Sequence, residues 1–307
     1  MTDSEEKKWI MSGLKSAQTA ISYQNSIWSR YSNDKVDIGV EVADVFKNLF
    51  RHLPSLSNIR ALSIGCGYEP QFRLLQALCD DTLYLLDLDQ DALNAIKERI
   101  QRQSIKGVFL LYKDFRIFLD AKQTEDFLNT ELDGKPVKAI FLHHSLYYCE
   151  MSKWNNLIRN LFNIVLGPKG AIHCVLMACE SDNRSTTTWL YNYFAGRFCN
   201  HHNNQDILKF SNQLKKDLLF KRANITTKTT QVRFFVDNFE QVMAVIWMIL
   251  LYPSVHQYSD SQKKKIIQHI YREFFLPKKA LIQNQNHMVI YKNLCTGQKS
   301  TKNRTTI

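Results

Sequence analysis

The sequence predicts an α/β fold: a doubly wound, mostly parallel seven-stranded sheet with helical elements that cap the strand tips, where ligands bind in such sheets. Three observations predict it. Residues 60–89 read strand, glycine turn, helix, strand and acid, the layout of a nucleotide-binding βαβ unit. Five strand patterns between Ala61 and Met177 alternate with helix patterns, as in a parallel sheet. Two later β-rich runs, 226–236 and 287–291, are separated by helices and predict an antiparallel edge.

The first strand pattern ends at the turn Gly65-Cys66-Gly67. Glycines there let the backbone pass close under a ligand, and Asp87, at the tip of the second strand, is placed to accept hydrogen bonds from ribose hydroxyls. A dinucleotide fingerprint has a third glycine where this chain has Pro70, because a pyrophosphate needs close approach of helix and strand. The pattern therefore predicts a ligand with a nucleoside but no pyrophosphate, and S-adenosylmethionine (SAM) fits that description. The alternative interpretation of Gly65-Cys66-Gly67 is an ordinary tight turn between a strand and a helix.

Two further strand tips carry polar side chains. The third strand pattern leads to Asp114 and Phe115, a carboxylate that can accept from the exocyclic amine of an adenine and a ring that can stack on the base. The fourth strand pattern ends at His143 and His144. Adjacent histidines on a strand alternate between its faces, so they cannot easily ligate one metal ion, and we expect no metal site.

A helix pattern covers Asp37 to Leu53, where apolar side chains recur on one face. Glu41 sits on or beside this stripe, and an acid there is costly unless something pairs with it. Glu41 is therefore either a boundary residue that reaches water or a carboxylate aimed into a ligand pocket. Further helices are predicted over 90–102, 153–165, 186–198, 204–219, 238–251 and 259–275.

These patterns divide the chain into four parts. We expect an N-terminal helical cap over 1–55 and a SAM-binding α/β core over 56–180. Residues 181–296 supply a second helical cap and the final antiparallel strands of the same sheet. The polar stretch 297–307 is predicted to be a disordered tail.

Charge and hydropathy limit the classes of partner. The net charge is +11, and residues 256–307 hold ten basic residues against two acidic ones. Much of this charge lies in the run 263–265 and in the polar tail, without interleaved aromatic residues that would stack on bases, so we expect no nucleic-acid partner. Because no apolar run approaches the ~18 residues of a membrane helix, we expect no membrane partner either.

The cysteines and the N-terminus bear on the compartment. The seven cysteines include no CxxC pair and are predicted to be free thiols in a reducing environment. The N-terminus lacks the basic-then-apolar layout of a signal peptide. We therefore expect a cytoplasmic protein, acting as a monomer on a small-molecule substrate.

The motifs SIGCG, LDLD, KDF and LHHSLYY, in this order on successive strands, resemble those of class I SAM-dependent methyltransferases. More narrowly, the chain resembles the histamine N-methyltransferase family from about Glu41 to Tyr291. LYNYFAGRF is similar to a segment of that family, and HMVIYKN falls where its final strand lies. The resemblance implies a Rossmann-like methyltransferase fold, with SAM as the cofactor and S-adenosylhomocysteine as the product.

The resemblance also implies the residues of a site. Cofactor-contacting positions of the family fall on Gly65, Gly67, Asp87 and His143. Substrate-contacting positions fall on Glu41, His144, Tyr148, Tyr191 and Gln283. One tryptophan of the family's aromatic box falls on Thr187, so part of that box is missing here.

By this resemblance, the expected function is N-methylation of a small amine or imidazole-type metabolite by in-line displacement, with no residue assigned as the catalyst. Two alternatives stay open: a methyltransferase acting on protein or RNA through the basic C-terminal region, and a SAM-binding protein without turnover. The chain lacks an Asn-Pro-Pro-Tyr type motif after the fourth strand, which weighs against the first alternative. The intact glycine turn and the acids Asp87 and Asp114 weigh against the second.

Overall fold

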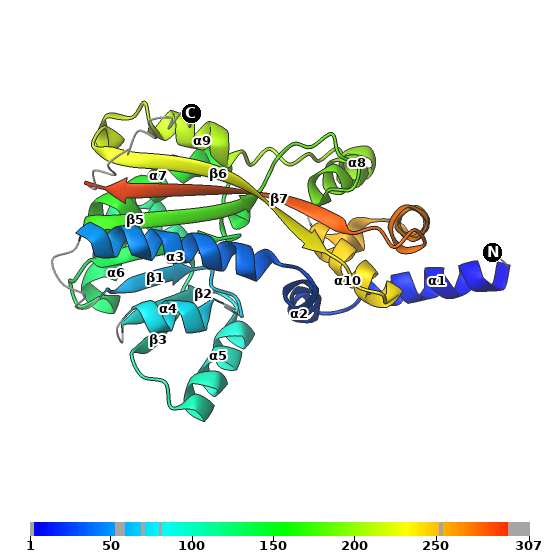
Figure 1. Cartoon of the computed structure of the whole chain (residues 1–307), viewed down its shortest axis with the longest axis horizontal. Helices are drawn as coiled ribbons and strands as arrows, with labels where there is room; N and C mark the ends of the chain where they lie inside the picture. Colours follow the sequence, from blue (N-terminus) through cyan, green and yellow to red (C-terminus); the bar gives the residue numbers. More distant parts are fainter. Residues whose placement is uncertain (1–2, 53–58, 69–70, 80–81, 252–253, 294–307) are drawn as a thin grey trace, which may run out of the picture.

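The computed structural model describes residues 3–52, 59–68, 71–79, 82–251 and 254–293, which form one seven-stranded sheet with flanking helices (Figure 1). The strand order is β3-β2-β1-β4-β5-β7-β6. The strands are β1 Ala61–Ile64, β2 Leu83–Asp87, β3 Val108–Tyr112, β4 Val137–His143, β5 Leu166–Met177, β6 Ala223–Phe234 and β7 Leu281–Lys292. Strands β1 to β5 are parallel, and β7 lies antiparallel between β5 and β6. The predicted mostly parallel, doubly wound seven-stranded sheet is confirmed.

The winding of the sheet changes direction at β1. This strand pairs with β2 on one side, from which the chain continues outward to β3, and with β4 on the other. Ser63 of β1 lies beside Phe141 of β4, so Gly65 and His143 follow at the same edge of the sheet. Ligands bind outside the carboxyl ends of the strands at such a switch point. The fold therefore brings the glycine turn and the β4 tip together.

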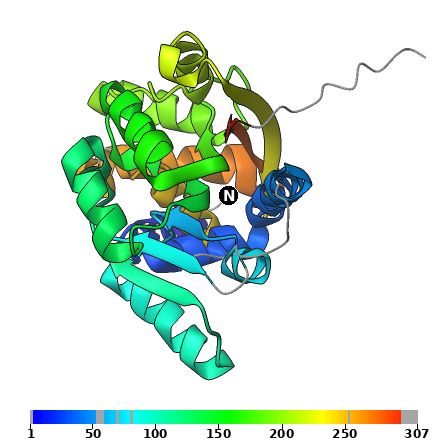
Figure 2. The same cartoon turned by 90° about the vertical axis from the view of Figure 1, so that its left-hand side faces the viewer.

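Helices cover both faces of the sheet, as the turned view in Figure 2 also shows. Alternate residues of β4 enter the two layers: Phe141 packs in the cluster of α3, α4 and α5, and Ile140 in that of α6, α7 and α9. These helices are α3 Asp34–His52, α4 Phe72–Leu78, α5 Gln90–Gln103, α6 Ala121–Glu131, α7 Trp154–Asn160 and α9 Ile207–Leu214.

A third apolar cluster gathers helices from both ends of the chain, at the right of Figure 1. They are α1 Asp3–Ser16, α2 Ile21–Tyr31, α8 Thr187–Cys199, α10 Phe239–Ile249 and α11 Asp260–Ile270. Trp9 of α1 packs edge-on against Phe239 of α10, with ring centroids 5.3 Å apart. The indole N–H of Trp247 donates to the carbonyl of Gly13 at 2.8 Å. The predicted N-terminal and C-terminal caps therefore share one helical core.

Some element ends differ from the prediction. Strand β6 begins at Ala223, before the predicted β-rich run, because it pairs with β7 along its whole length. The helix predicted over 153–165 is α-helical only to Asn160 and continues as a π-helical turn to Val165. The predicted tail, 297–307, lies outside the described residues.

Two expectations about the whole chain can be compared with the described part. Within it, every helix is too short or too polar to cross a lipid bilayer. The described cysteines are free thiols, as predicted, and they are Cys66, Cys79, Cys149, Cys174, Cys179 and Cys199. Cys295 lies outside the described residues.

Candidate active site

Backbone hydrogen bonds fix the loop after β1 to the end of β2. The N–H groups of Gly65 and Cys66 both donate to the carbonyl of Leu86, at 2.8 and 3.2 Å. Gly65 and Gly67 have φ angles of +65° and +54°, in the left-handed region that favours glycine. The N–H of Gly67 donates to Oδ2 of Asp87 at 2.6 Å. The predicted turn and the predicted acid are therefore one hydrogen-bonded unit.

The two glycines meet different surroundings. A Cβ at Gly65 would lie 2.5 Å from the Cβ of Ser145, so a residue without a side chain is needed where the loops after β1 and β4 meet. A Cβ at Gly67 would meet no heavy atom of the described residues within 4 Å. The hydroxyl of Ser145 is buried and, among the described residues, has no hydrogen-bond partner. The loop thus leaves open space at Gly67, where a ligand would pass.

Alanine at these two positions should separate packing from ligand access. Gly65→Ala adds an overlap at 2.5 Å to a left-handed backbone, and we expect the free energy of unfolding to fall by about 3 kcal/mol. Gly67→Ala has the backbone cost alone, about 1 kcal/mol. Urea unfolding of both variants measures the difference. Equal losses would contradict the crowding assigned to Gly65.

Asp87 keeps hydrogen-bonding capacity for a ligand. Its Oδ1 accepts the N–H of Asp89 at 2.8 Å, and its Oδ2 accepts the N–H of Gly67. A carboxylate offers about four acceptor positions, so some remain for ribose hydroxyls. The side chain is partly exposed at the edge of the sheet, where those hydroxyls would approach.

Tyr148 lies near this acid, with 68% of its surface exposed. Desolvation by the surrounding protein, followed by the negative charges of Asp87 and Asp89, raises the pKa of Tyr148. The contact of Tyr148 with the substrate stays a prediction.

The acid and the aromatic residue after β3 both contact other residues of the protein. Asp114 accepts the backbone N–H of Arg116 at 2.9 Å and the guanidinium Nε–H of the same residue at 2.7 Å. These hydrogen bonds hold the pKa of Asp114 below its usual value. Phe115 is 9% exposed and packs in an apolar core cluster. The ring is therefore largely enclosed in the core, and its stacking on a base, like the contact of Asp114 with an adenine, stays a prediction.

The two histidines at the β4 tip diverge, as their alternation on a strand predicts. His144 has φ of +58°, and its N–H donates to the carbonyl of Val175 at 2.9 Å. Its ring stacks on that of Tyr147, whose hydroxyl lies 3.4 Å from Nδ1. His143 turns instead toward β5. In the part of the chain that the structure describes, no group of three or more His, Cys, Asp or Glu side chains is placed to hold a metal ion.

A buried carboxylate that sequence patterns did not identify faces His144. Asp34, the first residue of α3, is fully buried, and its Oδ1 lies 3.5 Å from Nε2 of His144. The ammonium of Lys35 lies 3.0 Å from its Oδ2. Burial by itself would raise the pKa of Asp34, but the lysine charge and the histidine hold it well below the usual range. The predicted helix began at Asp37, so Asp34 was not recognised as part of its buried face.

Three histidines and an acid form a line across the sheet. Nε2 of His143 lies 3.1 Å from Nδ1 of His173 in β5, and Nε2 of His173 lies 3.2 Å from Nδ1 of His287 in β7. Nε2 of His287 lies 3.2 Å from Oδ2 of Asp37 in α3. We call these four residues the histidine line. It connects the β4 tip, beside the glycine turn, with the helix that covers this face.

Further polar side chains converge on Asp37. The hydroxyl of Thr230 donates to its Oδ2 and lies 2.9 Å from Nε2 of His287. The amide of Gln285 donates to the same carboxylate oxygen at 3.0 Å, and that of Gln283 donates to Gln285 at 2.9 Å. Burial would raise the pKa of Asp37, but these donors hold it below its usual value. The structure thus places Gln283, a predicted substrate contact, within the network that ends at Asp37.

Sequence patterns did not single out His173, His287 or Asp37. His173 interrupts an apolar strand pattern, AIHCVLM in β5, and His287 stands directly before one, MVIY in β7. These positions are the signal that could have identified them, because a buried polar side chain needs a partner. Which partner they meet depends on strand order, since the two histidines are 114 positions apart.

Glu41 does not face the β4 tip. It forms an ion pair with Lys228 of β6, a strand that β5 and β7 separate from β4. Glu41 lies one helical turn beyond Asp37, and its partner Lys228 stands beside His287 in the register of β6 and β7. The expectation that it faces a cavity at the β4 tip is therefore corrected, and the acids of α3 that reach the histidines are Asp34 and Asp37.

Removing the charge of Glu41 should have little effect. Its partner Lys228 is 56% exposed, although the side chain of Glu41 itself is 12% exposed, and ion pairs that are open to solvent contribute about 0–1 kcal/mol. We expect Glu41→Gln to lower the free energy of unfolding by less than about 1 kcal/mol, with Lys228→Gln as the matched variant. Urea unfolding measures both. A loss several times larger would mean that Glu41 has a further buried partner.

Helix α8 covers the end of β5. Thr187, at its first position, is fully buried, and its hydroxyl lies 3.0 Å from Sδ of Met177, the last residue of β5. A small side chain therefore stands where the resembled family has a tryptophan. Tyr191, one turn later, is buried in the helical cluster. Its contact with the substrate stays a prediction.

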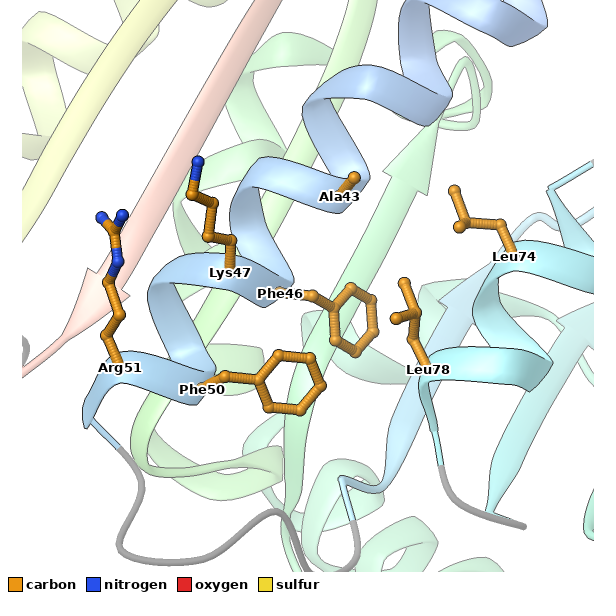
Figure 3. A pocket seen from close by; sticks show the side chains of 7 residues that line it. All are labelled: Ala43, Phe46, Lys47, Phe50, Arg51, Leu74 and Leu78. Carbon is orange, nitrogen blue, oxygen red and sulfur yellow. The ribbon is translucent and has the colours of Figure 1, made fainter.

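A groove of about 480 Å³ lies between α3 and α4, away from the strand tips. Figure 3 shows Phe46 and Phe50 of α3 turned toward Leu74 and Leu78 of α4. Its lining is mainly apolar and includes none of the predicted site residues. We therefore place the candidate site at the glycine turn and the β4 tip rather than in this groove.

The sheet order, with β7 antiparallel between β5 and β6, and the glycine turn at the switch point match the Rossmann-like methyltransferase fold. Similar solved structures include two bacterial proteins. The YcgJ protein from Bacillus subtilis has a TM-score of 0.52 and 10% identity, over 81% of this chain and 98% of its own. A candidate methyltransferase from Bacillus halodurans C-125 has a TM-score of 0.51 and 12% identity, over 80% of this chain and 98% of its own. No protein-family model and no curated protein matches the sequence.

Proposed function

We propose that this protein is a SAM-dependent methyltransferase that N-methylates a small amine or imidazole-type metabolite. The main observation behind the proposal is that the glycine turn and Asp87 are hydrogen-bonded to each other at the switch point of the sheet. There the N–H of Gly67 is bonded to Asp87, and the space at Gly67 is open. The fold supports methyl transfer as the reaction class, with SAM as the cofactor and S-adenosylhomocysteine as the product.

The residues present fit SAM. Asp87 has acceptor capacity for the ribose hydroxyls, and the open space at Gly67 lets a nucleoside approach the backbone. Asp114, at the end of β3, lies beyond the neighbouring strand tip, where the adenine of such a nucleoside would reach. We assign the cofactor to this edge of the sheet.

Methyl transfer from a sulfonium places modest demands on a protein. The acceptor's lone pair forms a bond to the methyl carbon while the S–C bond breaks and leaves its electron pair on sulfur. The acceptor must be unprotonated and held in line, about 3–3.5 Å from the methyl carbon. An imidazole, with a pKa near ~6.5, is largely unprotonated at pH 7, whereas an alkylamine, near ~10, must first lose a proton.

The acceptor is assigned to the β4 tip. Ser145 there stands against Gly65, so the side chains around it lie next to the cofactor loop. The buried, ionised Asp34 behind His144 favours an acceptor that is cationic or carries an N–H group. The proposed acceptor contacts are His144, Tyr148, Tyr191 and Gln283.

Binding and transfer can be tested in sequence. Calorimetry of the wild-type protein should give saturable, one-to-one binding of SAM and of S-adenosylhomocysteine. Incubation with tritiated-methyl SAM and separate extract fractions should then label the small-molecule fraction. Label in protein or RNA instead would replace the small-molecule acceptor with a macromolecular one. Failure to bind SAM would refute the proposed function.

A further inference from the structure

The histidine line has a direction, which the carboxylate of Asp37 sets. An ionised carboxylate only accepts hydrogen bonds, and the hydroxyl of Thr230 already donates to it, so Nε2 of His287 must carry a proton. A neutral imidazole that donates from Nε2 accepts at Nδ1. His287 therefore accepts from Nε2 of His173. By the same reasoning, Nδ1 of His173 accepts from Nε2 of His143.

This order leaves one nitrogen free. Nδ1 of His143 carries a lone pair, and no described residue forms a hydrogen bond with it. His143 is partly exposed, whereas His173 and His287 are buried. By register, His143 stands level with Gly65, the first residue of the glycine turn. The free lone pair therefore lies on a side chain at the edge of the sheet where methyl transfer is proposed.

We propose that His143 is the general base of the methyl transfer, and that Asp37, acting through the two buried histidines, is a positioning residue. The proposal rests on the proposed function, N-methylation at this edge. In the step, the acceptor nitrogen bonds to the methyl carbon, and the S–CH₃ bond breaks with its electron pair left on sulfur. The N–H proton of the acceptor passes to Nδ1 of His143. The imidazolium gives this proton to water when the product leaves.

The surrounding groups act on this base in opposite senses. Burial, with the neighbouring histidines and Lys35, lowers the pKa of His143 well below 6.5, so its lone pair is available at pH 7, but the same effects oppose the imidazolium that the step forms. Burial also lowers the pKa of His173 to about 3. Asp34 faces the ammonium of Lys35 and offsets its positive charge. The ionised Asp37 at the far end stabilises the positive charge that the base acquires, which is the logic of a base oriented by a carboxylate.

The tautomers can be measured without any acceptor, by ¹⁵N NMR of histidine-labelled protein. At pH 7 we expect the three histidines of the line to be neutral and protonated on Nε2. In Asp37→Asn the new amide can donate to Nε2 of His287, which reverses the line and moves the proton of His143 to Nδ1. His256→Gln, at an exposed histidine, is the matched control and should leave the three signals unchanged. A wild-type His143 that is protonated on Nδ1, or charged, would overturn the proposal even if Asp37→Asn does not fold.

Kinetics separates the base from the proposed function itself. Wild-type protein that binds no SAM would refute the methyltransferase assignment. The tautomer measurement would still test the direction of the hydrogen bonds in the histidine line. In active protein, Asp37→Asn should lower tritium transfer from SAM to the small-molecule fraction about 100-fold at unchanged SAM affinity. Its residual rate should rise with pH, because the acceptor then loses its proton to solvent, whereas the wild-type rate stays level between about pH 6 and 8. Equal rates or parallel pH profiles would overturn the positioning role.

Discussion

Replacing Asp87 with alanine should weaken SAM binding by about 100-fold or more while leaving the protein folded. Its carboxylate has capacity left for two ribose hydroxyls, and each hydrogen bond to a charged group contributes about 1.5–3 kcal/mol. Losing both corresponds to at least two factors of ten in the dissociation constant, at about 1.4 kcal/mol per factor. The substitution also removes the anchor of Gly67, which loosens the loop that the cofactor meets.

Calorimetry with SAM measures this effect, and circular dichroism checks that the variant is folded. Asp91→Ala is a matched control, because Asp91 is an exposed acid on the same segment. It should bind SAM as the wild-type protein does. Undiminished affinity for SAM in a folded Asp87→Ala protein would contradict the assignment of the cofactor site to this edge of the sheet.

The second large effect is a loss of stability in mild acid, caused by the histidine line. His173 is fully buried and its pKa is lowered from 6.5 to about 3. Below pH 6.5 the unfolded chain binds a proton at this residue, whereas the folded protein stays neutral until about pH 3. The unfolded state therefore binds more protons, and stability falls as the pH falls through this window. Between pH 7 and pH 4 His173 alone should cost about 3 kcal/mol.

Other titratable groups also lower the stability of the protein as the pH falls, but not all of them act in the same pH range. His143, whose pKa is also lowered, adds to the loss below pH 6.5. Asp34 and Asp37 have lowered pKa values, so the stability that they contribute is present above pH 3.8 and is lost as the pH falls below it. His269, whose pKa is also lowered by burial, acts in the same window, so the slope of stability between pH 4 and pH 6.5 reports mainly on His143, His173 and His269.

Urea unfolding at several pH values between 4 and 7 measures this slope. His173→Gln, which cannot take a charge, should be less stable at pH 7 but should flatten the slope by about 1.4 kcal/mol per pH unit. His256→Gln should keep the wild-type slope, since its side chain is exposed. A slope unchanged in His173→Gln would mean that this histidine is not kept neutral by burial.

Local patterns were sufficient to predict the strands of the sheet and the glycine turn after the first of them. The glycine turn and Asp87 lie within a single βαβ unit, and the structure joins them by the hydrogen bond from Gly67. Phe115 shows the limit of such reasoning. Its position after a strand tip predicted a stacking platform, and only the structure shows that the ring is 9% exposed and belongs to an apolar core cluster.

The sequence by itself determined where the seven strands and most of the helices lie, and where the glycine turn follows the first strand; helices α1, α2 and α6 were not predicted. These features depend on residues close together in the chain, through periodicity and glycine geometry. Only the tertiary structure decided that Glu41 meets Lys228 and that His143 reaches Asp37 through two buried histidines. Periodicity states that a side chain is buried but not what it is buried against. The partner is set by the order of strands across the sheet, which the packing of the whole chain selects.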